Sequence, residues 1–113
     1  MNPSLVSAFV VSAATLCSIP AALAQDPDAG RALAAACFTC HGTAGNSVQG
    51  VPPSLAGRNG AELFQTMKDF QSGKRPATIM HQQARGYSDT QLKLIASYFA
   101  SVKPSAARPS SKP

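Results

Sequence analysis

One pentapeptide constrains the fold of this chain of 113 residues more than any other feature. Residues 37–41 read Cys-Phe-Thr-Cys-His, and this spacing of two thiols and one imidazole is the attachment sequence for c-type haem. On a helix, Cys37 lies one turn from both Cys40 and His41. Both thiols can therefore bond to the edge of one porphyrin while the imidazole reaches its iron. We predict one covalently bound haem c per chain, held by Cys37 and Cys40, with His41 as an axial ligand.

Three other interpretations of this pentapeptide are a zinc site, a redox dithiol and a chance match within a helix. A zinc site needs further Cys or His ligands, and the only other His in the sequence is His81. A thioredoxin-type dithiol lies beside a strand, and no run of this chain alternates apolar and polar residues as a half-buried strand does. The sequence favours haem attachment over all three.

The first 24 residues are typical of a secretory signal peptide. Val6 to Leu16 form an apolar stretch too short to span a bilayer as a helix, and residues 22–24 offer a small-residue cleavage site. A retained membrane anchor and a lipid attached at Cys17 are the alternatives. Cleavage would remove Cys17 and leave no membrane span. The mature chain would be so small that a bound cofactor would help to stabilise it.

Three helical patterns follow, separated by loops rich in Gly, Pro and Ser. The expected helices run from near Asp28 to Cys40, from Ala61 to Ser72 and from Ser88 to about Val102. Their stops are Gly42, Gly73 and Pro104. Gln91 completes a capping box with Ser88. We therefore predict an all-α domain at residues 25–103 with three main helices. Residues 104–113 lack an apolar pattern and are expected to form a disordered tail.

The segment 42–58 is expected to be a long loop, because it holds four glycines and the pair Pro52-Pro53. Loops of this length in a small domain are commonly functional, and a bound cofactor is an obvious object for this one to surround. His41 must present its Nε2 to the iron, so its Nδ1 hydrogen should find a carbonyl acceptor. Pro53 is the best candidate for that acceptor, and a simple loop proline is the alternative.

Met80 and His81 are the candidates for the second axial position of the iron. We favour Met80, which is expected in a loop between Pro76 and the third helix, where its thioether can reach the open face of the haem. Plain core packing is the alternative role for Met80. His81 could replace it, and a His/His pair would lower the reduction potential that a Met/His pair raises. Met67 is set aside because it lies on an apolar face of the second helix that is expected to point at the core. This face comprises Leu63, Phe64, Met67 and Phe70.

The balance of charge favours an acidic partner. Ten Lys and Arg residues stand against five Asp and Glu, which gives a formal net charge of +5 at neutral pH. Nucleic acid is set aside as a partner, because export leaves no opportunity for it and no basic cluster is denser than Lys74-Arg75. Basic groups around the haem edge would attract an acidic redox protein. The rate of association would then fall as the salt concentration rises.

Gly30, Tyr98 and the run from Pro53 to Gly57 add three further features to the Cys-x-x-Cys-His sequence. Together they resemble the small bacterial class I cytochromes c, over nearly all of the chain from Gly30 to Val102. Gly30 looks like that family's helix-crossing glycine, Tyr98 like its aromatic partner on the last helix, and the run like its P-x-L-x-G loop. The resemblance implies the class I fold, with long loops around one haem, and a Pro53 carbonyl that accepts from His41.

Residues 70–99 show a narrower resemblance. FQSGKRPATIM, ARGYSD and an amphipathic helix ending SYFA look like the haem subunits of flavocytochrome c sulfide dehydrogenases. In those subunits the Met that matches Met80 binds the iron. The resemblance implies periplasmic sulfide oxidation, in which an FAD-containing subunit takes electrons from sulfide and the non-catalytic haem subunit receives them one at a time.

Two other functions are compatible with the same motif. A free soluble carrier to a terminal oxidase or another periplasmic redox enzyme would have the same haem site. A catalytic or gas-binding haem protein would leave the iron five-coordinate, and it would need a distal acid or base, for which the segment around Met80 offers only His81. The predicted Met80 ligand fills that position, so the sequence favours electron transfer.

Overall fold

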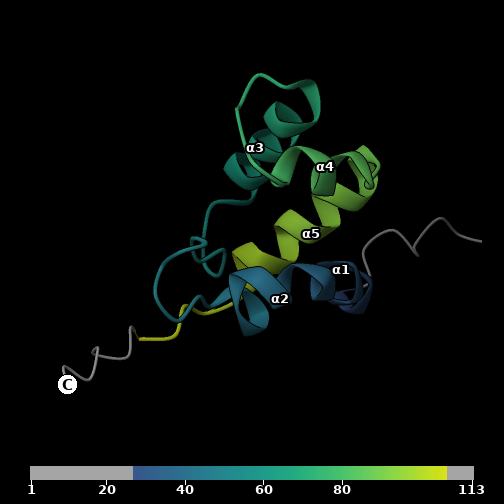
Figure 1. The fold of residues 1–113 in the computed structure, drawn as a ribbon. Coiled ribbons are helices and arrows are strands. Elements are labelled where there is room, and N and C mark those ends of the chain that lie inside the picture. The colour runs from purple at the N-terminus through teal and green to yellow at the C-terminus, as the bar shows by residue number, and fades with distance from the viewer. Residues whose placement is uncertain (1–26, 107–113) are drawn as a thin grey trace, which may run out of the picture.

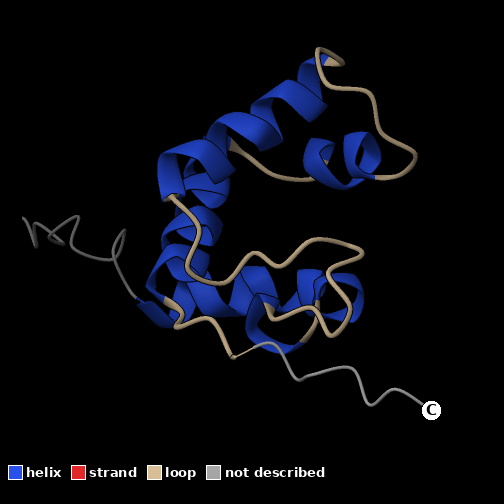
Figure 2. Ribbon diagram, turned by 90° about the vertical axis from the view of Figure 1, so that its left-hand side faces the viewer, coloured by secondary structure: helices blue, strands red, loops and turns tan. Residues whose placement is uncertain are grey.

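The computed structural model describes residues 27–106, and within that part of the chain the secondary structure is helical with no strand (Figure 2). The all-α prediction is confirmed. The predicted signal peptide at 1–24 lies outside the described residues, as does most of the predicted tail, from residue 107 on. The predicted domain boundaries therefore stay predictions. Within the described part, no helix is both long and apolar enough to cross a membrane.

The first helical segment comprises α1 (Pro27–Ala34), the 3-10 turn η2 (Ala35–Cys37) and α2 (Phe38–His41). It ends at Gly42, whose φ of 83° belongs to the left-handed region that favours glycine. A Cβ at Gly42 would also collide with the backbone carbonyl of Asn46. The predicted helix from near Asp28 to Cys40 is confirmed, with Gly42 as its stop. The 3-10 turn η2 in its middle was not predicted.

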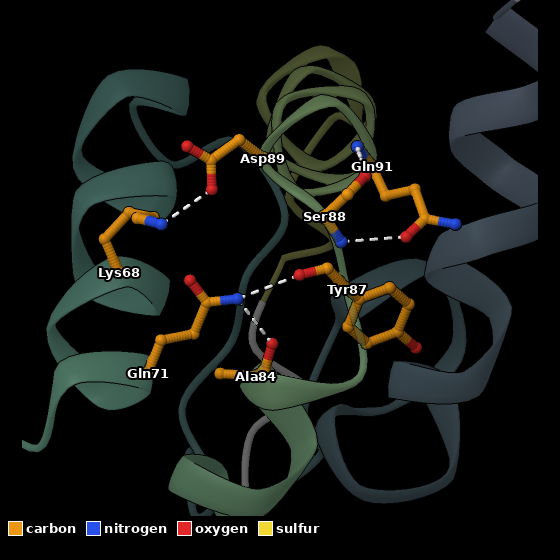
Figure 3. A network of polar contacts seen from close by, with 7 residues as sticks. All are labelled: Lys68, Gln71, Ala84, Tyr87, Ser88, Asp89 and Gln91. Carbon is orange, nitrogen blue, oxygen red and sulfur yellow. Dashed lines mark hydrogen bonds and ion pairs between the residues drawn. The ribbon is translucent and has the colours of Figure 1, made fainter.

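The two longer helices are α3 (Gly60–Ser72) and α5 (Asp89–Ser101). The side-chain oxygen of Asn59 caps α3 by accepting from the backbone N–H of Glu62 at 3.1 Å, and Gly73 ends the helix as predicted. The predicted capping box of α5 is present (Figure 3). The Gln91 N–H donates to Ser88 Oγ at 3.2 Å, and the Ser88 N–H donates to Gln91 Oε1 at 2.9 Å. The predicted loop 42–58 contains one 3-10 turn, η3 (Thr43–Gly45), and otherwise no helix.

The helices α1 and α3 pack against α5. α1 crosses α5, and α3 packs against both α5 and the short helix α4 (Met80–Arg85) (Figure 1). The crossing is close at Gly30, where a Cβ would lie 2.8 Å from the carbonyl oxygen of Leu94 and 3.3 Å from the Cβ of Tyr98. Only a glycine allows this approach. The resemblance implied such a crossing at Gly30 and Tyr98, and the structure confirms it.

The buried core is small. Its central cluster is Ala34, Ile95 and Phe99, each at most 5% exposed. Partly buried side chains pack around this cluster, namely Leu33, Cys37, Phe38, Leu55, Leu63, Tyr87 and Tyr98. A core of this size fits a small fold that depends on a bound apolar group.

The prediction that the apolar face of α3 points at the core is only partly right. Leu63 packs against the core cluster, but α3 contains no fully buried residue. Basic side chains cover two of its aromatic rings: Lys93 Nζ lies 5.6 Å from the ring centroid of Phe64, and Arg75 Cζ lies 5.4 Å from that of Phe70. The long stems of Lys and Arg can cover such half-buried rings while their charges stay in water.

The helix α4 was not predicted. Met80, expected in a loop, instead opens this helix, so the prediction of its local structure is wrong. Six residues are too few to show an apolar period, and Ile79 before them makes no side-chain capping bond. Tertiary contacts stabilise the helix, and its Ala84 is fully buried at 0% exposed.

Candidate functional site

The pentapeptide 37–41 lies where the first helical segment ends. Phe38, within it, fixes the segment on α5 through two aromatic contacts. Its ring centroid lies 6.0 Å from that of Tyr98 and 6.2 Å from that of Phe99, the second pair being edge-to-face. The fold therefore presents two thiols and one imidazole from a single short helical segment whose position on the last helix is set by packing.

The surroundings of Cys37 differ from those of a reactive thiol. Cys37 is half-buried and Cys40 is exposed, and no disulfide joins them. Burial raises the pKa of the Cys37 thiol above its ordinary value, and the neighbouring Cys40 adds to this rise. A reactive thiol has the opposite property, a pKa lowered toward neutral pH. In residues 27–106, no group of three or more His, Cys, Asp or Glu side chains is placed to hold a metal ion.

His41 is buried, at 7% exposed, and the long loop orients its ring. Its Nδ1 lies 2.7 Å from the carbonyl oxygen of Pro53, so the Nδ1 hydrogen is donated to that oxygen. The tautomer that this bond selects leaves Nε2 without a proton and free to bind a metal. The expected hydrogen bond from His41 Nδ1 to the Pro53 carbonyl is present in the structure.

Backbone hydrogen bonds hold the loop that carries Pro53. The N–H groups of Leu55 and Ala56 both donate to the carbonyl of Gly45, at 2.8 and 3.1 Å. The N–H of Gly57 donates to the carbonyl of Phe99 on α5 at 2.8 Å. Because these bonds tie the loop to η3 and to the last helix, the fold sets the position of the Pro53 carbonyl.

Met80 and His81 begin α4, which lies near the end of α5 away from α2 (Figure 1). Both side chains are half-buried, and so is Met67 on α3. The Nδ1 atom of His81 is enclosed by protein atoms and has no hydrogen-bond partner among the described residues. The structure thus brings the first axial candidate and its orienting carbonyl together, whereas the choice of Met80 as the second ligand stays a prediction.

Gln71 positions α4, and this residue was not predicted from the sequence. Its side-chain Nε2 donates to the carbonyl of Ala84 at 2.8 Å and to the carbonyl of Tyr87 at 2.9 Å (Figure 3). Both carbonyls lie at or just after the end of α4, and the Ala84 carbonyl also accepts from the backbone N–H of Tyr87 at 3.3 Å. Beside this contact, Lys68 Nζ lies 2.6 Å from Asp89 Oδ1 and links α3 to the start of α5. Nothing in the sequence distinguishes Gln71 from a surface glutamine.

Gln71→Ala is expected to lower the free energy of unfolding by about 1–3 kcal/mol, because two partly buried hydrogen bonds are lost and the Ala84 carbonyl alone keeps a backbone donor, the N–H of Tyr87. Since α4 carries Met80, the predicted second ligand of the iron, the ferrous protein should also bind carbon monoxide faster. Denaturant unfolding and carbon monoxide binding of the haem-loaded protein measure the two effects. Gln65→Ala removes an exposed hydrogen bond to Asp69 on the same helix and is the control, expected within about 0.5 kcal/mol of the unaltered protein. Equal effects in the two variants would contradict the role given to Gln71.

The residues of this site fit a covalently bound haem. Two thiols lie within one turn of each other, and the adjacent imidazole has its Nδ1 already bonded and its Nε2 free. The thioether of Met80 on a separate helix is of the kind that binds haem iron opposite a His. Cys37, half-buried against the core cluster, would connect such a group directly to the hydrophobic core.

Comparison with known proteins agrees with this chemistry. A family model for cytochrome c matches residues 27–103. The cytochrome subunit of sulfide dehydrogenase from Chlorobaculum tepidum is 38% identical over 73 residues, which cover 65% of this chain and 66% of that relative. Cytochrome c4 of Pseudomonas aeruginosa is 44% identical over 80 residues, 71% of this chain and 40% of the relative. Cytochrome c-554(548) of Halomonas halodenitrificans is 33% identical over 81 residues, 69% of this chain and 98% of the relative. The chain thus spans less than two thirds of the length of the first two relatives.

Proposed function

Because this chain belongs to the cytochrome c family, we propose that it works in the periplasm as the haem subunit that accepts electrons from a sulfide-oxidising flavoprotein. Members of the family bind haem c covalently, and the chain contains one Cys-x-x-Cys-His sequence. It is therefore a monohaem electron carrier. The bound haem supplies an iron that takes up and gives away one electron at a time.

The hydrogen bond from His41 to Pro53 carries this proposal. It holds the imidazole ring of His41 in one orientation and leaves its Nε2 free to act as an axial ligand. In the proposed site Cys37 and Cys40 form the thioether bonds, and Met80 on α4 is the second axial ligand. Two protein ligands leave no iron position open to a substrate, which suits electron transfer rather than catalysis at the iron.

The proposed donor is suggested by the relative that is the cytochrome subunit of sulfide dehydrogenase, with 38% identity. Sulfide oxidation at a flavin would release two electrons, and this chain would accept them singly and pass each to an acceptor. The net charge of +5 favours a donor that is acidic overall. Transfer between two proteins also requires the haem attachment residues to lie near the surface, and Cys40 is exposed.

An optical spectrum of the protein, purified gently from its native periplasm, tests the proposed donor. We expect flavin absorption beside that of c-type haem, together with a larger co-purifying chain. Haem without flavin would contradict a fixed flavoprotein partner and would favour a free carrier. Absence of the protein from the periplasmic fraction would contradict the proposed location.

A free carrier to a terminal oxidase or another periplasmic redox enzyme is the second candidate. Cytochrome c-554(548) favours it, because this chain spans 98% of that relative, so a protein of this kind exists as little more than the one domain. The residues that hold the haem would be the same in both cases. Only the permanence of the contact with the partner differs.

A further inference from the structure

The chain that follows α5 stays in contact with the rest of the fold. The backbone N–H of Ser105 donates to the side-chain oxygen of Asn46 at 2.6 Å, across 59 residues of sequence. One residue earlier, Pro104 packs so closely on Gly57 that a Cβ at Gly57 would lie 2.5 Å from Pro104 Cγ. Pro104 and Ser105, which we call the strap, therefore contact the loop 42–58 near its start and near its end (Figure 1).

Hydrogen bonds also join the two ends of this loop to each other. The carbonyl of Gly45 accepts from two backbone N–H groups near the end of the loop, and the N–H of Ser47 donates to Ser54 Oγ at 3.0 Å. Asn46, which accepts from the strap, lies between Gly45 and Ser47. Pro53, whose carbonyl orients the axial imidazole, comes directly before Ser54. A movement of Asn46 would therefore pass through one hydrogen bond to the segment that positions Pro53.

Asn46 also lies against the end of the haem-attachment segment. Its backbone carbonyl is so close to Gly42 that a Cβ at Gly42 would collide with it. Gly42 directly follows His41, and its N–H donates to the carbonyl of Phe38 in the same segment at 3.0 Å. Asn46 is thus connected both to the segment that supplies the imidazole and to the loop that supplies the acceptor for that imidazole.

We propose that the strap fixes the ring of His41 through Asn46, which acts as a positioning residue for the axial ligand. The inference rests on the proposed function, in which His41 binds the haem iron. A hydrogen bond at Nδ1 makes the imidazole a stronger donor to the iron, and this stabilises the oxidised state. Release of the strap lets the loop open locally and weakens the bond between His41 and the Pro53 carbonyl. The reduction potential of the haem should then rise.

Two shortened chains, both loaded with haem, test the role of the strap. One chain ends at Lys103 and lacks the strap, whereas the control ends at Ala106 and keeps it. Removal of the strap should raise the equilibrium constant for reduction about threefold, which is about 30 mV for one electron at about 59 mV per tenfold. The amides of Ser47 and Gly57 should exchange with deuterium about tenfold faster, because their bonds open locally. A redox titration and hydrogen exchange followed by NMR measure these effects, and the control should match the full chain in both.

Single substitutions in the full chain isolate the hydrogen bond between Ser105 and Asn46. Ser105→Pro removes the N–H donor and should raise the reduction potential as the loss of the strap does. Ser105→Ala keeps that donor and is the matched control, expected to leave the potential unchanged. Asn46→Ala removes the acceptor and should raise the potential, whereas Asn46→Asp retains an acceptor oxygen and should restore the value of the unaltered protein.

Three results would overturn the role given to the strap. The first is an unchanged reduction potential in both Ser105→Pro and the chain that ends at Lys103. The second is an equal rise in the chain that ends at Ala106, because the effect would then come from residues 107–113. The third is faster exchange throughout the helices without a shift in potential, which would indicate a general loss of stability. An unaltered haem spectrum in His41→Ala would instead contradict the proposed function, and the role of the strap with it.

Discussion

Met80→Ala is expected to let carbon monoxide bind rapidly to the ferrous protein and to lower the reduction potential by on the order of 0.1 V, within the range of about 0.8 V over which axial ligands set haem potentials. The reason is that the thioether of Met80 is the proposed second axial ligand and an alanine cannot replace it. A thioether stabilises the reduced iron, so its loss favours the oxidised state. Carbon monoxide binding by rapid mixing and a redox titration measure the two effects.

Met67→Ala is the matched control, because Met67 is a half-buried methionine on α3 that the proposal does not place on the iron. This variant should lose roughly 2 kcal/mol of stability, at the low end of the range for a buried methionine, and should not open the iron. If Met67→Ala opened the iron and Met80→Ala did not, the ligand assignment would be wrong. If neither variant did, His81 would be the ligand, and His81→Ala would open the iron instead.

The ends of the three main helices could be predicted because their signals are local. Ser88 and Gln91 form a capping box with each other, and Gly42 and Gly73 adopt positive φ angles of 83° and 77° where their helices stop. Each signal lies within a few residues of the feature that it sets. The same holds for the site, where one pentapeptide supplies both thiols and the imidazole.

Features that depend on contacts between distant residues could not be predicted in this way. α4 forms without a capping side chain, and Gln71 binds carbonyls 13 and 16 residues further along the chain. The Pro53 carbonyl was proposed as the acceptor for His41, yet its position results from bonds that Gly45 and Phe99 accept from the loop. The apolar face of α3 was expected at the core, but periodicity does not reveal how much of such a face its neighbours cover.

Gly30→Val is expected to lower the free energy of unfolding by roughly 3 kcal/mol, at the upper end of what overpacking usually costs. A Cβ at Gly30 would lie 2.8 Å from the carbonyl oxygen of Leu94 on α5, and a backbone atom cannot move aside as the end of a flexible side chain can. Valine adds two further methyl groups at the same point. Because the segment that begins with α1 continues to Cys37 and His41, a shift of α1 should also disturb the iron ligands. Denaturant unfolding of the haem-loaded protein, followed by its haem spectrum, measures both effects.

Gly86→Ala is the control for this prediction. Gly86 has a helical φ of −72°, and a Cβ there would meet its nearest neighbour, the Gln83 carbonyl oxygen, at an ordinary 3.6 Å. Alanine should therefore be tolerated, or should stabilise the fold by up to about 1 kcal/mol because it lowers the conformational entropy of the unfolded chain. The contrast separates the close crossing of α1 and α5 from a general loss of glycine flexibility. Equal stability of the two variants would mean that α1 can move away from α5 at little cost, and that the crossing does not hold the haem-binding segment in place.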